Sequence, residues 1–143
     1  GVRYPDCARR RLARADIAYK GWLPNFRVPQ VFSEARLTVH VPRKPYAGQL
    51  PGIATIRPFE ALACGIPLIC APWQDSEGLF RPGQDYLVAS DGRRMRECIE
   101  QILTHSDRAR RLADSGLDRI RSRHTCAHRV DELLRICGTL RGR

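Results

Sequence analysis

The sequence is poor in lysine, has no closely spaced cysteine pair and lacks a long apolar run. Lys20 and Lys44 are its only lysines, so almost all of its positive charge is arginine. The six cysteines include no C-x-x-C pair, and several stand in apolar runs, where cysteine behaves as a small hydrophobic residue. Because no signal peptide is recognisable at Gly1 either, we expect a reduced, cytoplasmic setting. No apolar run approaches the roughly 20 residues of a spanning helix, so we expect any membrane contact to be peripheral.

The sequence also has fewer acidic than basic residues. Lys+Arg number 25 and Asp+Glu 15, which gives a net charge of +10 at pH 7. This balance favours an anionic partner, whether a nucleoside diphosphate, a nucleic acid or a membrane surface. The alternative is a well-solvated, arginine-rich surface that reflects coding bias.

The length of 143 residues fits one ordinary domain with one sizeable core and is too short for two Rossmann-like domains. We therefore predict a single domain over residues 1–143. Within it, residues 1–16 are expected to be the truncated start of a larger protein and residues 141–143 a frayed tail.

The most informative stretch is 55–72, which indicates a loop, a short helix, a tight stop and a buried strand. Pro58 suits a first helical position, and Gly65 suits the left-handed position just past a helix end. The run from Ile66 to Ala71 is apolar without alternation, as in a strand that is covered on both faces. A buried strand after a helix is typical of an α/β fold.

The start of this helix combines a cation with an acid. We expect Arg57 just before the helix and Glu60 in its first turn, next to unpaired backbone N–H groups that favour an anion. Arg57 could clamp a phosphate, and Glu60 could accept hydrogen bonds from the vicinal hydroxyls of a ribose. The alternative is a surface ion pair that only complements the helix dipole.

The remaining segments continue the α/β pattern. A strand that runs into a glycine turn is predicted at 17–24, further strands are predicted at 37–41 and 85–89, and a helix is predicted at 28–34. Apolar stripes predict helices whose inward faces include Met95 to Leu103, Leu112 to Ile120 and Val130 to Cys137, and we assign all three stripes to the core.

Three motifs occur in an order that resembles a known family. They are Arg-x-Phe-Glu-Ala-x-Ala-Cys-Gly-x-Pro-x-Ile from Arg57, Phe-Arg-Pro-Gly-Gln-Asp from Phe80, and His-Thr-Cys-Ala-His-Arg from His124. From about Tyr4 to Ile136 the chain resembles the nucleotide-sugar-binding domain of GT-B glycosyltransferases, closest to the bacterial group that includes the spore-maturation-type proteins. The resemblance implies a Rossmann-like three-layer domain with a parallel sheet of about five strands and a helical C-terminal segment, one half of a GT-B fold.

The resemblance also implies where a nucleotide sugar binds. The turn containing Gly21, Trp22 and Leu23 would lie beside the nucleobase, although we expect the Trp22 side chain to serve the core. The long loop that carries Arg43 would cradle the diphosphate, because open α/β sheets bind ligands outside the carboxyl ends of their strands. The substrate-binding residues proposed on this basis are Glu60, Arg57, Arg43, Gly52, Thr55, Ile56, Gly21, Trp22 and Leu23.

One departure limits what can be carried over from the family. Many relatives have an E-x₇-E pattern, but the position eight before Glu60 is Gly52 here. A catalytic acid and the stereochemistry of transfer therefore cannot be assigned, and the catalytic residues stay unknown.

A metal site at 124–128 is considered because imidazole and thiolate are zinc ligands. If Thr125 caps the following helix, His124 lies before it and cannot share a face with His128. No fourth ligand is near in the sequence. We predict no metal and no cofactor.

The favoured function is donor binding in a glycosyltransferase that needs an acceptor domain from elsewhere, so the isolated chain is expected to be inactive. The alternative is a basic, non-catalytic module for nucleic acid or an anionic surface, although no recognisable nucleic-acid motif is present. A third possibility is a regulatory domain that keeps the fold without catalysis.

Overall fold

The computed structural model describes residues 4–42, 52 and 54–141. These form two compact units, Gly1–Val31 and Phe32–Arg143, and each unit is described by itself. The prediction of one domain over the whole chain is not tested by this division and stays a prediction.

The first unit contains α1 (Asp6–Arg14), the 3₁₀ helix η1 (Asn25–Arg27) and the start of α2 (Val28–Ser33). The strand predicted at 17–24 is wrong, because this segment has no regular structure. Positive φ angles at Asp16 (54°) and Gly21 (71°) break the extended backbone on either side of residues 17–20. A short extended segment is a stable strand only as part of a sheet.

The second unit is built on a three-stranded parallel sheet in the order β1 (Thr38–His40), β2 (Leu68–Cys70) and β3 (Leu87–Val88). Val39 lies opposite Ile69, and Ile69 lies opposite Leu87. All three residues of β2 are buried, as expected for a central parallel strand. Among the described residues the sheet has three strands, so the prediction of about five is corrected.

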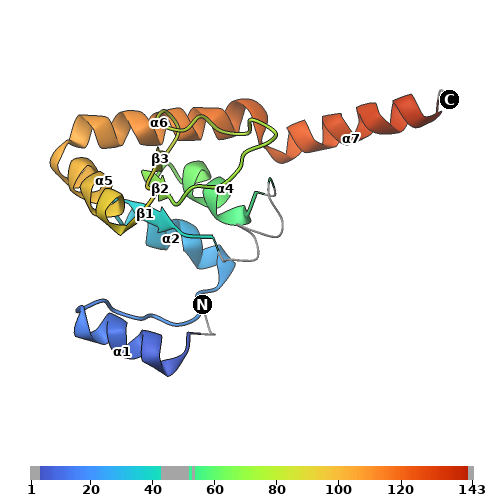
Figure 1. Ribbon diagram of the computed structural model, residues 1–143. Helices are drawn as coiled ribbons and strands as arrows, with labels where there is room; N and C mark the ends of the chain where they lie inside the picture. Colours follow the sequence, from blue (N-terminus) through green and yellow to red (C-terminus); the bar gives the residue numbers. More distant parts are fainter. Residues whose placement is uncertain (1–3, 43–51, 53, 142–143) are drawn as a thin grey trace. The chain divides into compact units, whose positions relative to one another are not determined.

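The sheet is flanked by α4 (Ile56–Ala63), α5 (Gly92–Thr104) and α6 (Ser106–Arg123), and α7 (Cys126–Arg141) leads away from it (Figure 1). The main core cluster joins one face of the sheet to α5 and α6. Its buried members are Ile69, Leu87, Ala89, Cys98, Ile102 and Leu112. The core assignment of the α5 and α6 stripes is therefore confirmed.

The predicted stop after α4 is also confirmed. Gly65 has φ 64°, its N–H donates to the carbonyl of Leu62, and the N–H of Ile66 donates to that of Ala61. This pair of bonds is the Schellman motif, which satisfies carbonyls that the helix end would leave unpaired. It turns the chain directly into β2.

The apolar stripe of α7 is not core, which corrects that prediction. Val130, Leu133, Leu134 and Leu140 are between 54% and 66% exposed. Periodicity predicts an amphipathic helix, but it does not say whether anything covers the apolar face. Across the described part of the chain, no helix is long and apolar enough to span a bilayer.

Close packing at Gly116 joins α6 to α4. A Cβ atom at Gly116 would lie 2.5 Å from the Cδ2 atom of Leu62 and 3.0 Å from the backbone oxygen of Asp85. Leu62 is itself fully buried. Glycine therefore sets the separation of the two helices here.

We predict that Gly116→Ala lowers the free energy of unfolding by about 1–3 kcal/mol, because the added methyl group overpacks this contact. The matched control is Gly138→Ala in α7, where an added Cβ meets no atom within 4 Å. That change should be neutral or stabilising by up to about 1 kcal/mol, from helix propensity. Urea unfolding of both variants measures the difference, and equal stability would contradict the prediction.

Candidate functional site

The site lies where two strands of the sheet end and α4 begins. His40 is the last residue of β1, Cys70 is the last residue of β2, and the two are paired in the sheet register. Thr55 precedes α4 as its N-cap residue. The carboxyl edge of a parallel sheet and the amino end of a helix thus meet, which is the usual position for ligands in open α/β folds.

His40 connects these elements. Its Nε2 atom lies 3.0 Å from the Thr55 hydroxyl oxygen and its Nδ1 atom 3.8 Å from the Cys70 sulfur. The Thr55 hydroxyl is therefore turned toward His40 and does not cap α4. The first N–H groups of the helix consequently lack a side-chain cap and face the edge of the sheet.

The helix begins two residues earlier than predicted. Ile56 is its first residue, Arg57 its second and Pro58 its third, which puts Glu60 in the second turn. The predictions that Arg57 precedes the helix and that Glu60 stands in the first turn are wrong. Proline is tolerated throughout the first turn, where N–H groups have no helical partner, so Pro58 did not identify the first residue.

Arg57 and Glu60 form an ion pair. The Arg57 Nη1 atom lies 2.9 Å from the Glu60 Oε2 atom, and the two side chains are 42% and 23% exposed. Apart from this ion pair, the Glu60 Oε2 atom is buried and has no hydrogen-bond partner within the described residues. Arg57 also lies over the ring of Phe32, 5.9 Å from its centroid. The ion pair anticipated from the sequence is present, with a hydrogen-bonding oxygen left unused.

A cavity of about 520 Å³ lies beside the start of α4. It brings the loop before α4, the segment after β2 and the start of α7 together. Its lining residues are Gly52, Ala54, Ile56, Phe59, Glu77, Leu79, His124 and Arg129. The lining combines apolar walls with one acid, one imidazole and one guanidinium, a mixture suited to a small polar ligand.

An aromatic cluster supports the wall of this cavity. The rings of Phe59, Phe80 and His124 lie with centroids 4.9–5.4 Å apart. The His124 Nε2 atom is 3.0 Å from the Leu79 carbonyl oxygen. The Asp75 carboxylate accepts from the N–H groups of Leu79 and Phe80, which fixes the segment that carries them.

Burial shifts the titration of several groups around the site. Burial and then the Arg57 charge lower the pKa of His40 below 6.5. Burial and the charges of Arg129, Arg123 and Arg119 lower the pKa of His124 against the opposing hydrogen bond to Leu79. Both rings are therefore neutral at pH 7. Burial raises the pKa of Cys70 to about 12, so this thiol stays protonated.

The structure brings part of the predicted site together. Gly52 and Ile56 line the cavity, Thr55 bonds to His40, and Arg57 pairs with Glu60 outside the lining. Arg43 lies outside the described residues.

The predicted nucleobase contacts belong to the other unit. Gly21, Trp22 and Leu23 are in the first unit and are described with it. The core role expected for the Trp22 side chain is wrong, because it is 69% exposed.

The sequence analysis assigned no site role to His40, Phe59 or Arg129, and it considered His124 as a metal ligand only to reject it. His40 lies within the strand predicted at 37–41, which was the one usable signal for it. The rings of His124 and His128 are both engaged, the first with Leu79 and the second with Thr125 at 2.7 Å.

The second unit is an α/β domain with a three-stranded parallel sheet, and its fold matches part of a GT-B glycosyltransferase. The chain is similar to sucrose-phosphate synthase from Thermosynechococcus elongatus, with a TM-score of 0.72 and 20% sequence identity. The match covers 94% of this chain and 35% of that chain, so this chain spans about a third of that enzyme. Comparison with curated proteins finds no match.

The family is shown by a separate comparison. The family model described as glycosyl transferase-like matches residues 1–135. The chain belongs to this glycosyl transferase-like family, and the resemblance found in the sequence is confirmed.

We predict that acid destabilises the chain through His40 and His124. A histidine whose pKa is lowered by folding binds a proton more readily in the unfolded state. The contribution of the two histidines to the free energy of unfolding is therefore fully present above pH 6.5, the unfolded value, and is lost as the pH falls below it. Urea unfolding between pH 7.5 and 5.5 should show a smaller loss of stability in the double variant His40→Gln/His124→Gln. The exposed His105, changed to Gln, is the control, and an unchanged slope in the double variant would contradict the assignment.

Proposed function

We propose that the chain is the donor-binding part of a glycosyltransferase and that it binds a nucleoside-diphosphate sugar at the start of α4. The observation that carries the proposal is the meeting of an uncapped helix start, Arg57 and Glu60 at the carboxyl edge of the parallel sheet. Membership of the glycosyl transferase-like family supports it.

The diphosphate is proposed to lie against the amino end of α4. The N–H groups of Ile56 and Arg57 are free of a capping side chain, and the helix dipole favours negative charge there. The Arg57 guanidinium adds a donor in a forked geometry that matches phosphate oxygens. These groups would stabilise the charge that builds on the diphosphate as it leaves the sugar.

The ribose is proposed to bind Glu60. An ionised carboxylate accepts two hydrogen bonds from vicinal hydroxyls, and the Glu60 Oε2 atom has an unused acceptor position. When the ligand binds, the ribose hydroxyl groups would take the place of Arg57 at Glu60, and the Arg57 guanidinium would bind the phosphate instead. Before binding, the ion pair keeps both side chains next to the site. The partial exposure of both side chains leaves room for this exchange.

The sugar itself is proposed to occupy the cavity of about 520 Å³ beside α4. Glu77 and the neutral His124 offer acceptors for its hydroxyl groups, and Phe59 offers an apolar wall. Contacts of the nucleobase with Gly21, Trp22 and Leu23, and of the diphosphate with Arg43, stay predictions.

Transfer is proposed to require an acceptor domain supplied from outside this chain. The match to about a third of sucrose-phosphate synthase is consistent with part of an enzyme. The uncovered apolar stripe of α7 is a surface against which further protein could pack. We retain the expectation of a bacterial, cytoplasmic protein with peripheral membrane contact at most, and we assign no catalytic base.

We predict that Arg57→Ala and Glu60→Ala each weaken nucleotide-sugar binding about tenfold or more, because each removes a charge-assisted hydrogen bond. Calorimetry with UDP, GDP, ADP and dTDP sugars measures the affinity. The matched control is the pair Arg94 and Glu97 on α5, which has the same spacing and a 3.0 Å contact. Arg94→Ala and Glu97→Ala should leave the affinity unchanged.

Normal affinity in both α4 variants would remove the proposed site. Steeply salt-dependent binding of long nucleic acid, with no binding of small diphosphates, would instead favour the basic binding module.

We also predict that the 143-residue chain alone transfers no sugar, because we assign no acceptor site or base among the described residues. Incubation with labelled nucleotide sugars should release nucleotide at the rate of the protein-free control. Faster release that disappears in Arg57→Ala would contradict the need for a second domain while keeping the donor site.

A further inference from the structure

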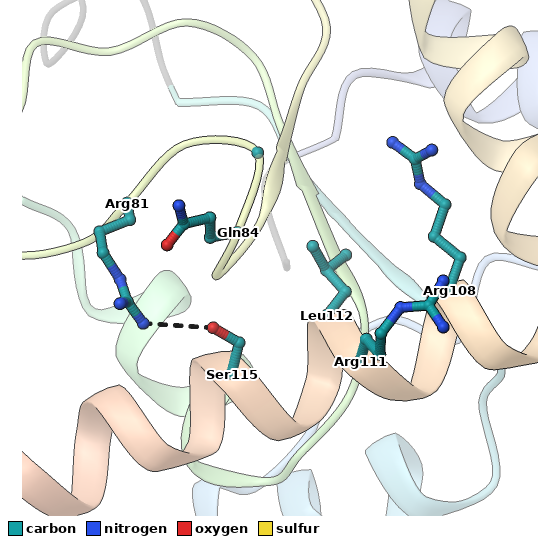
Figure 2. A pocket seen from close by; sticks show the side chains of 7 residues that line it. Arg81, Gln84, Arg108, Arg111, Leu112 and Ser115 are labelled. Atoms are coloured by element: carbon teal, nitrogen blue, oxygen red, sulfur yellow. Dashed lines mark hydrogen bonds between the residues drawn. The ribbon is translucent and has the colours of Figure 1, made fainter.

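A second cavity, away from the proposed donor site, is lined largely by arginine. It measures about 410 Å³ and lies between the turn before β3 and the first half of α6. Figure 2 shows that Arg81 and Gln84 come from the turn, whereas Arg108, Arg111, Leu112 and Ser115 come from α6. An adjoining cavity of about 520 Å³ shares Arg108 and Arg111 in its lining.

One wall of the cavity is held in place by a buried carboxylate. Asp85 is fully buried and accepts from the Arg81 backbone N–H, from the Arg81 guanidinium at 2.9 and 3.2 Å, and from the Ser115 hydroxyl at 2.8 Å. Burial opposes the charge of Asp85, but these hydrogen bonds outweigh it and lower the pKa of the carboxyl group. Arg81 is therefore fixed in orientation, while its side chain remains 48% exposed at the cavity.

The other two arginines carry uncompensated charge. Among the described residues, neither Arg108 nor Arg111 forms an ion pair or a side-chain hydrogen bond, although Arg81 and four arginines elsewhere in the second unit pair with acids. Asp107 lines the adjoining cavity, and it lies beyond 4.0 Å of both guanidinium groups. Guanidinium groups that share a concave surface and form no ion pair favour a bound anion.

We infer that this arginine-lined cavity binds a phosphate-bearing anion between Arg108 and Arg111 of α6, with Arg81 and the Gln84 amide at its far wall. Arginine presents several N–H donors in a planar fork, which fits the oxygens of a phosphate group. Two guanidinium groups in one cavity lining suit a ligand with at least two negative charges, such as a diphosphate or a phosphorylated lipid headgroup. The buried Leu112 side chain adds an apolar part to the lining.

This site is separate from the proposed donor site and does not depend on it. Ser115 of the arginine-lined cavity and His124 of the donor cavity are nine residues apart in the chain, and a helical rise of 1.5 Å per residue separates them by about 14 Å. The two cavities share no lining residue. Binding at one can therefore be measured independently of the other.

The test uses the full chain and inorganic diphosphate, followed by amide NMR shifts. Diphosphate should shift the amides of Gly83, Gln84 and Leu112. The double variant Arg108→Gln/Arg111→Gln should weaken this binding about tenfold or more, because two charge-assisted contacts are lost. The matched control Arg110→Gln/Arg121→Gln removes the same charge from exposed positions of α6 that line neither cavity, and should change the affinity less than about twofold.

A second arm identifies the source of the phosphate. Sedimentation with phosphatidic acid–phosphatidylcholine vesicles, against phosphatidylcholine alone, tests a lipid headgroup, because phosphatidic acid carries a phosphomonoester that can hold two negative charges. Vesicle binding that is lost only in Arg108→Gln/Arg111→Gln supports a headgroup ligand, and diphosphate binding without vesicle binding supports a soluble one. Equal weakening in the two double variants, shifts confined to Thr55 and Ile56, or no binding of either probe would overturn the inference.

Discussion

The close approach of α4 to α6 at Gly116 is the constraint on which the arrangement of the second unit depends. Leu62 of α4 occupies the space that any larger residue at Gly116 would need, and the backbone of Asp85 lies against the same point. The two helices α4 and α6 and the turn before β3 therefore meet at Gly116, which has no side chain. Since interiors are packed as densely as crystals, this contact fixes the distance of α4 from the rest of the unit. The direction in which α4 presents its amino end follows from it.

The proposed donor site and the arginine-lined cavity obtain their positive charge from different groups. At the carboxyl edge of the sheet, the uncapped start of α4 combines backbone donors with Arg57 and Glu60. Along the first half of α6, side-chain guanidinium groups provide the positive charge, and backbone donors are not involved. Backbone N–H groups in a helix are already ordered, so binding to them costs no side-chain entropy. The α6 cavity instead uses arginine side chains, and Asp85 orders one of its three arginines. The positive charge of the chain is thus organised in two different ways.

Local chemistry made some elements predictable from the sequence. Gly65 and Pro67 force a stop after α4, and the apolar run that follows can only be covered on both faces, so the stop and β2 were predicted correctly. Pro58 was a weaker guide, since proline marks the first turn of a helix without identifying its first residue. The extended segment at 17–24 had strand-like composition, but whether a segment joins a sheet is decided by residues far away in the chain.

The sites required information that no local pattern contains. His40 carries no motif, and its contact with Thr55 arises because β1 ends next to the start of α4. The α6 cavity joins residues about 30 positions apart, so arginines that looked like scattered surface charge in the sequence share one concave surface. The apolar stripe of α7 shows the reverse case, in which a clear periodic pattern specified the helix but not a neighbour for it.

The distribution of the six cysteines gives the chain a built-in chemical selectivity. Cys7, Cys126 and Cys137 are exposed, whereas Cys70 and Cys98 are buried and the thiol of Cys70 is held in its protonated form. Cys64 is half-buried, and burial and then the Glu60 charge raise the pKa of its thiol, which disfavours the thiolate. Thiolate is the species that alkylating reagents and oxidants attack. Modification is therefore directed to α1 and α7, and the end of β2 beside His40 is spared. A fluorescent maleimide can consequently be attached to α1 or α7 while the chemistry at the edge of the sheet is left intact.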